Sequence, residues 1–295
     1  MKTIGLLGVP MDLGQERRGV DMGPSAIRYA GVEERLMRLH YTVVDYGDIV
    51  VKGRCVSQQG DAHLKNLQSV VDASVAVKKR VLNMLGDGVF PLILGGDHSI
   101  SIGTVAAINA SKQNLGVIWY DAHGDLNIPE TSPSGNIHGM PLAVNLGLGH
   151  PLLTSIASSN IKPQHIVLIG ARALDDGEKE LIHQLGIKVF TMHEIDKLGM
   201  TDVMEQTIDY LKQTDGVHLS LDLDALDPIE CPGVGTPVLG GITYRESHLA
   251  MEMLAESGLI SSAEFVEVNP ILDHRNKTAE VAVALIGSLF GEKLL

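Results

Sequence analysis

Short apolar runs rich in β-branched and aromatic residues alternate along the chain with longer segments in which apolar residues recur at helical spacing. The runs Val117–Tyr120 and Ile166–Ile169 are apolar at every position, which is typical of parallel strands covered on both faces. No linker-like stretch or internal repeat interrupts the alternation. We therefore predict a single α/β domain over residues 1–295, with a mostly parallel central sheet and helices on both faces. A TIM barrel is the main alternative, because it also consists of repeated strand–helix units.

The same patterns predict where individual elements lie. Strands are expected at residues 3–9, 41–45, 90–94, 115–120, 165–169, 187–191, 217–223 and 260–266. Helices are expected at residues 24–39, 63–85, 176–185, 201–213, 243–257 and 277–290, with one more starting near residue 100. Two long loops rich in glycine and proline, 127–136 and 228–241, follow strand ends that carry acidic residues. Ligands bind at such ends in open α/β sheets.

Charge and composition exclude several classes of protein. Hydrophobic residues make up 44% of the chain, so a large core can form and disorder is not expected. The net charge of −13 argues against a nucleic-acid partner, because such binding needs clustered lysine and arginine. The same charge weakly favours a cationic small-molecule substrate.

Features of the termini and of the cysteines bear on the cellular compartment. The apolar start of the chain reads as a first strand and not as a signal peptide. The uncharged stretch 281–291 is too short to span a bilayer, so no membrane association is expected. Two cysteines, Cys55 and Cys231, are too few for a disulfide framework and are expected to be free thiols. We expect a cytoplasmic protein.

Candidate metal ligands cluster at three predicted strand ends. Asp121, His123 and Asp125 are spaced two residues apart, and side chains at this spacing in an extended chain point to one side. Asp222 and Asp224 repeat the pattern on a later strand, and His98 follows a third. Each motif alone is more often a cap or a turn, but a parallel sheet would bring all three to one edge. Carboxylates and two imidazoles without a thiolate suit manganese, iron or cobalt, and two bridged ions favour hydrolysis.

Five motifs occur in the order seen in the ureohydrolases, and over its whole length the chain resembles the arginase branch of that family. The opening segments Gly8–Gly14 and Arg18–Pro24 also match that branch. The five motifs are Gly95–Ser99, Asp121–Asn127, Ser134–Gly139, Ser220–Pro228 and Glu267–Pro270.

The resemblance implies two Mn²⁺ ions per chain and the hydrolysis of L-arginine to L-ornithine and urea by a metal-bridging hydroxide. Asp121 and Asp222 would bridge the ions; His98 and Asp125 would complete one site, and His123 and Asp224 the other. Asp125 would also orient the hydroxide by a hydrogen bond. By the same resemblance His138 is a proton shuttle and Glu267 contacts the guanidinium group. His218 lies in phase with Ser220 and Asp222, but we expect it to be an ordinary surface histidine.

Substrate selection is also implied by the resemblance. Asn127, Ser132 and Ser134 would bind the α-carboxylate, and Asp175 and Glu178 would hold the α-ammonium group. Asp176 could instead be the N-cap of the following helix. Pro133 stands where several relatives have a hydroxyl residue, which affects fine contacts of the loop and not the reaction.

Other readings stay open on the sequence alone. A ureohydrolase acting on another guanidino compound, such as agmatine, is the close alternative. A one-metal zinc deacetylase and a non-enzymatic protein with a decayed site are more distant. The segment Tyr244–Glu246 resembles one used at subunit interfaces in the arginase branch, so we expect a homo-oligomer, a trimer or hexamer.

Overall fold

The computed structural model describes residues 3–51 and 63–295, and its centre is one sheet of eight strands in the order β2-β1-β3-β8-β7-β4-β5-β6. Every strand pair is parallel, as predicted. The sheet is open, with β2 and β6 at its edges, so the TIM-barrel alternative is wrong. The strands are β1 (Thr3–Gly8), β2 (Thr42–Asp48), β3 (Phe90–Leu94), β4 (Gly116–Tyr120), β5 (Ile166–Ala171), β6 (Lys188–Thr191), β7 (Val217–Asp222) and β8 (Ile260–Val266).

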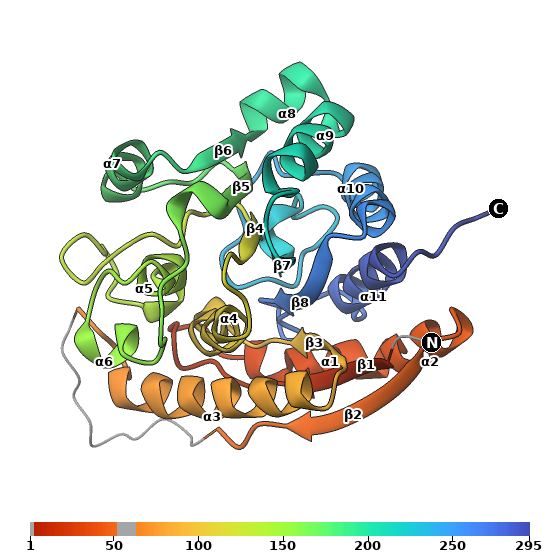
Figure 1. Cartoon of the computed structure of the whole chain (residues 1–295), viewed down its shortest axis with the longest axis horizontal. Helices are drawn as coiled ribbons and strands as arrows, with labels where there is room; N and C mark the ends of the chain where they lie inside the picture. The colour runs from red at the N-terminus through yellow and green to blue at the C-terminus, as the bar shows by residue number, and fades with distance from the viewer. Residues whose placement is uncertain (1–2, 52–62) are drawn as a thin grey trace.

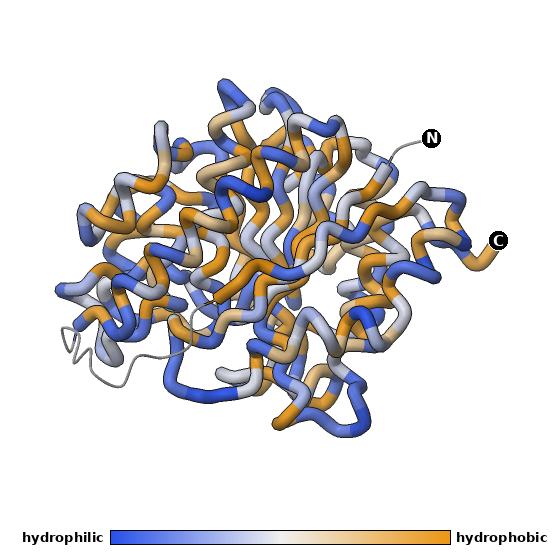
Figure 2. The backbone as a smooth tube through the Cα atoms, turned by 90° about the horizontal axis from the view of Figure 1, so that it is seen from below, coloured by the Kyte–Doolittle hydropathy of each residue, from blue (hydrophilic) through white to orange (hydrophobic). Residues whose placement is uncertain are grey.

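Helices cover both faces of the sheet, and each face has its own hydrophobic core (Figure 1). One face packs against α3 (Leu67–Gly86), α4 (Ser101–Ala110), α5 (Pro141–Asn145), α6 (Pro151–Thr154) and α7 (Asp176–Leu185). The other packs against α1 (Gly23–Tyr29), α2 (Val32–Arg38), α8 (Met192–Leu198), α9 (Met200–Leu211), α10 (Tyr244–Ser257) and α11 (Lys277–Leu289). Many helices carry both hydrophobic and hydrophilic residues, as expected for helices with one face on the core and one in solvent (Figure 2). No helix in the described residues is both long and apolar enough to cross a bilayer.

Several helix predictions need correction. The helix expected over 24–39 is two helices, because Gly31 has a φ of +88° and ends the first one. The helix expected from residue 63 begins at Leu67, since Asn66 is left-handed with a φ of +56°. The short helices α5, α6 and α8 were not predicted at all. Cys231 is a buried free thiol, and Cys55 lies outside the described residues.

The strand order places the acidic strand ends side by side. Strands β4 and β7 are neighbours in the sheet, and Tyr120 pairs with Leu221. The next residues, Asp121 directly after β4 and Asp222 at the last position of β7, therefore lie side by side at the carboxyl edge of the sheet. This edge is where open parallel sheets bind ligands.

Candidate metal centre and substrate pocket

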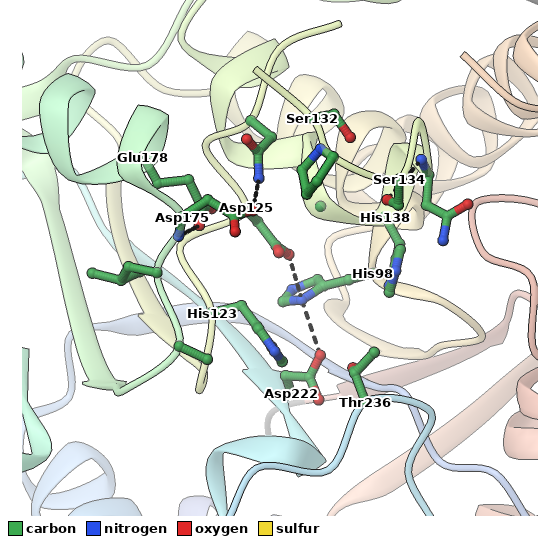
Figure 3. A pocket seen from close by; sticks show the side chains of 16 residues that line it. His98, His123, Asp125, Ser132, Ser134, His138, Asp175, Glu178, Asp222 and Thr236 are labelled. Atoms are coloured by element: carbon green, nitrogen blue, oxygen red, sulfur yellow. Dashed lines mark hydrogen bonds and ion pairs between the residues drawn. The ribbon is translucent and has the colours of Figure 1, made fainter. Parts of the chain in front are cut away.

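The six predicted ligands come together in two groups at the carboxyl edge of the sheet. Figure 3 shows four of them, His98, His123, Asp125 and Asp222. In the first group, Nδ1 of His98 lies 3.0 Å from Oδ2 of Asp121, 3.0 Å from Oδ2 of Asp125 and 3.2 Å from Oδ2 of Asp222. In the second group, Nδ1 of His123 lies 3.4 Å from Oδ1 of Asp121 and 3.2 Å from Oδ2 of Asp224. Asp121 thus presents one carboxylate oxygen to each group.

Local backbone geometry aims these side chains. Asp125 has a φ of +51°, in the left-handed region that few non-glycine residues adopt. Its carbonyl oxygen accepts hydrogen bonds from the amides of Leu142 and Ala143, at the start of α5, at 3.0 and 3.2 Å. The short helix that the sequence did not predict therefore holds Asp125 in its unusual conformation.

A close approach of backbones positions His98. A Cβ on Gly96 would stand 2.0 Å from the carbonyl oxygen of Met11, so only glycine fits there. The next residue, Asp97, accepts hydrogen bonds from the amides of Gly14 at 2.8 Å and Ser99 at 3.0 Å. His98 then opens a single turn of 3₁₀ helix, His98–Ile100.

Buried carboxylates crowd the centre and lack matching positive charge. Burial and the charges of Asp224 and Asp121 raise the pKa of Asp222 well above its usual range. Burial and the charge of Asp121 likewise raise the pKa of Asp125 to about 6. Within the described part of the chain, Nδ1 of His98 and Oδ2 of Asp125 are buried without a hydrogen-bond partner. Oxygen and imidazole donors in this state fit a pair of divalent cations such as Mn²⁺.

His138 stands beside the centre and is held by Glu267. Its Nδ1 lies 3.2 Å from Oε1 of Glu267. Burial alone would lower the pKa of His138, but the hydrogen bond and the negative charge of Glu267 outweigh it and raise that pKa. Glu267 also accepts hydrogen bonds from the amide of His98 at 3.0 Å and from Nε2 of Gln15 at 2.8 Å. Both carboxylate oxygens of Glu267 thus contact protein donors, which sequence reasoning did not anticipate.

A cavity of 470 Å³ opens above the centre, and the predicted substrate residues line it (Figure 3). Nδ2 of Asn127 donates a hydrogen bond to Oδ2 of Asp175 at 2.8 Å. The amide of Asp175 donates to Oε2 of Glu178 at 2.8 Å, and the amide of Leu126 donates to Oε1 at 3.0 Å. Burial is the main cause that raises the pKa of Glu178 to about 7. Asp175, and not the exposed Asp176, is the N-cap of α7.

The two serines lie on the outer side of the cavity. The hydroxyl of Ser132 accepts a hydrogen bond from the amide of Gly135 at 3.0 Å, and that of Ser134 accepts one from the amide of Asn136 at 3.2 Å. Both hydroxyl protons stay available for a ligand, because a serine oxygen can accept and donate at once.

Known proteins resemble this chain over its whole length. The model of the arginase family matches residues 2–291. The chain is 67% identical to the arginase of Bacillus caldovelox over 100% of both chains, and 62% identical to the arginase of Bacillus subtilis (strain 168) over 100% of this chain and 99% of that protein. The native structure of the B. caldovelox arginase, at 66% identity, matches with a TM-score of 0.98 over 100% of both chains. The chain belongs to the arginase family. As a member of that family it is a hydrolase.

In this arginase-family hydrolase, two side chains that the sequence analysis did not name contact the candidate metal ligands. Nε1 of Trp119 donates a hydrogen bond to Oδ2 of Asp121 at 3.0 Å, and its ring stacks on that of His98 at 4.2 Å. Oγ1 of Thr236 donates to Oδ2 of Asp224 at 2.9 Å. Strand periodicity could have identified Trp119, because it is two residues before Asp121 and side chains at that spacing point to the same side of a strand. Thr236 comes from a distant loop and carried no such signal.

Proposed function

We propose that the chain binds two Mn²⁺ ions and hydrolyses the guanidinium group of L-arginine, giving L-ornithine and urea. One observation carries the proposal: two ligand groups share Asp121 at the base of a cavity whose other end presents Asn127, Asp175 and Glu178. His98, Asp121, Asp125 and Asp222 would hold one ion, and Asp121, His123, Asp222 and Asp224 the other. When bound, such a pair lowers the pKa of a shared water and so supplies a nucleophile at neutral pH.

The residues around the centre perform the remaining steps. Asp125 accepts a hydrogen bond from the attacking water and orients it toward the guanidinium carbon. Addition of the water oxygen gives a tetrahedral carbon, and the bond from that carbon to the ornithine nitrogen then breaks. His138 donates a proton to the departing amine, and Glu267 raises the pKa of His138, which favours the protonated form that this step needs. Glu267 can also attract the cationic guanidinium, although its two oxygens already accept hydrogen bonds from the protein.

The outer end of the cavity selects an amino acid. Asn127, Ser132 and Ser134 offer neutral donors to an α-carboxylate, while Asp175 and Glu178 offer negative charge to an α-ammonium group. The hydrogen bond between Asn127 and Asp175 holds a donor and an acid together before the substrate arrives. Agmatine has no α-carboxylate and would leave the serine hydroxyls without a partner.

Urea release tests the proposed reaction. The purified chain, loaded with MnCl₂, is assayed with L-arginine and with agmatine under the same conditions, and its metal content is measured by elemental analysis. We expect urea from arginine at a much higher kcat/KM than from agmatine, and two manganese equivalents per chain. No urea from arginine, or a preference for agmatine, contradicts the proposed substrate.

We also propose that the chain, as one catalytic domain, assembles into a trimer or hexamer. The resemblance of Tyr244–Glu246 to an interface segment supports this. Light scattering coupled to size-exclusion chromatography gives the mass directly, and a single species of about one chain mass, 31.6 kDa, contradicts it.

A further inference from the structure

A chain of buried polar side chains runs through the sheet behind His98. His218 and Ser220 lie on β7, and Ser262 and Glu264 lie beside them on β8, where His218 pairs with Ser262 and Ser220 with Glu264. All four residues are completely buried, so the prediction that His218 is a surface histidine is wrong. A polar side chain buried in a sheet interior lowers stability unless it is hydrogen-bonded. We therefore ask which hydrogen bonds these four side chains make.

The contacts converge on one oxygen of Glu264. The hydroxyl of Ser220 donates a hydrogen bond to Oε1 at 2.7 Å, and the hydroxyl of Ser101, the first residue of α4, donates to the same atom. Nε2 of His218 lies 3.4 Å from it. At the far end, Nδ1 of His218 lies 2.9 Å from the hydroxyl of Ser262. Two hydroxyl donors on one oxygen identify that oxygen as an acceptor, as in an ionised carboxylate.

The hydrogen-bond chain determines where the proton of His98 lies. A serine hydroxyl has one proton, and Ser220 donates it to Glu264. The oxygen of Ser220 can then only accept from Nε2 of His98, which lies 2.8 Å away. Nε2 therefore carries the ring proton, and Nδ1 keeps a free electron pair directed at Asp121, Asp125 and Asp222.

The surroundings keep Glu264 ionised. Burial alone would raise its pKa, but the neighbouring imidazole of His218, 3.4 Å away, and the hydroxyl of Ser101 outweigh burial and lower the pKa to about 2. Glu264 also lies beside the first residue of α4, and helix N-termini favour negative charge.

We propose that Ser220 and Glu264 are positioning residues that hold His98 in the tautomer able to bind a metal ion, and so set the affinity of that half of the centre. The inference rests on the metal centre of the proposed function. It goes beyond that function because it predicts that the two metal sites depend on different residues for their affinity. The other histidine, His123, is 27% exposed at its side chain, so water can satisfy its second nitrogen.

Mn²⁺ binding to the metal-stripped full chain tests this. Two variants break the proposed hydrogen-bond chain. Ser220→Ala removes the acceptor for Nε2 of His98. Glu264→Gln introduces an amide donor, so Ser220 no longer has to donate its proton to residue 264 and can donate it to His98 instead. Ser220→Thr keeps the hydroxyl. MnCl₂ is titrated against a competing chelator, free Mn²⁺ is followed by electron paramagnetic resonance, and folding is checked by circular dichroism.

We expect Ser220→Ala and Glu264→Gln to weaken one of the two binding steps by about 10- to 100-fold, the range typical of residues that orient metal ligands. The other step should change little, and Ser220→Thr should restore most of the lost affinity. Thr236→Val is the matched control, because it removes a hydroxyl donor from Asp224 in the opposite half and should weaken the other step.

Two results overturn the inference while leaving the proposed function intact. In the first, the wild-type chain binds two ions, and the Ser220→Ala and Glu264→Gln variants bind both ions with the same affinity as the wild type. The other is an equal weakening of both steps that Ser220→Thr does not restore, which indicates only a packing role. A wild-type chain that takes up fewer than two ions contradicts the proposed function itself and the inference with it.

Discussion

The floor and the rim of the cavity are built in different ways. The floor consists of His98, Asp121, Asp125, Asp222 and Asp224, which are at most 5% exposed and lie at or after the carboxyl ends of strands β3, β4 and β7. The rim consists of the loop 127–136 and the start of α7, where Ser134 is exposed and Ser132 half-buried. Pairing of neighbouring strands determines the position of the floor, whereas side-chain and backbone hydrogen bonds within the loop determine the rim. We therefore expect substitutions in the floor to remove the reaction, and those in the rim to change which substrate binds.

Asp121→Asn should have the largest effect, because Asp121 faces both His98 and His123. Loss of its charge should lower kcat by more than about 100-fold, beyond what is typical for residues that only orient metal ligands. Manganese content and urea release should fall together. Two tightly bound ions and near-normal activity in this variant would show that Asp121 does not bridge the two groups.

His138→Asn sharpens the comparison at the boundary between floor and rim. Loss of the proton donor should lower kcat by about 10²- to 10⁴-fold, the usual contribution of general acid–base catalysis. Manganese content should stay at the wild-type value, because His138 contacts Glu267 and not the ligand groups. A variant that loses manganese as well as activity would place His138 in the metal centre instead.

Glu178 should make substrate binding depend on pH. Its pKa is raised to about 7 by burial and, to a smaller degree, by the charges of Asp125 and Asp175, so it is protonated below that pH. Only the ionised form attracts an α-ammonium group. The KM for arginine should therefore rise below pH 7, by up to about tenfold per pH unit, and level off above it.

Glu178→Gln is the control for this pH dependence. The amide has no charge to lose, so its KM should be higher at pH 8 and nearly constant from pH 6 to 8 at saturating Mn²⁺. An unchanged slope in Glu178→Gln would assign the pH dependence to another group.

Ser134→Ala tests the rim at a single hydroxyl. Loss of one hydrogen bond to the α-carboxylate should raise the KM for arginine by about two- to tenfold, corresponding to about 0.5–1.5 kcal/mol, with kcat nearly unchanged. The KM for agmatine, which has no carboxylate, should stay the same. Equal changes for the two substrates would argue against a carboxylate contact at Ser134.

The smallest effect is expected at Asp176. Its side chain is fully exposed, and Asp176→Ala should change the free energy of unfolding by less than about 0.5 kcal/mol. Asp175→Ala removes the N-cap of α7 and should cost about 1 kcal/mol in addition to its effect on substrate binding. Urea denaturation of both variants measures the difference. A larger loss of stability in Asp176→Ala would identify it as the cap.

The sequence predicted the floor of the cavity better than the rim. Spacing of Asp121, His123 and Asp125 along an extended chain was enough to place them together, because strand periodicity is a local property. The roles of Ser132 and Ser134 came only from the resemblance to a family, since a loop has no period that aims its side chains. The alternation of strands and helices along the chain does not determine the order of the strands in the sheet. A closed barrel and an open sheet were therefore both compatible with the sequence.

Other features were missed for equally physical reasons. Helices α5 and α6, of five and four residues, are too short to show a helical period. The break at Gly31 interrupts apolar spacing that otherwise continues from α1 into α2. The contacts of Thr236 and Glu264 join segments far apart in the chain, and no local pattern reports such contacts.

The strand order has a consequence for the biosynthesis of the protein. Strands β7 and β8, made last, occupy the middle of the sheet between β3 and β4. A nascent chain that has reached only β6 therefore has two separate three-stranded halves and lacks Asp222 and Asp224. Because such long-range pairing is slow to form, closure of the sheet is expected to be a late step in folding. The six candidate metal ligands therefore come together only after β7 and Asp224 have been made.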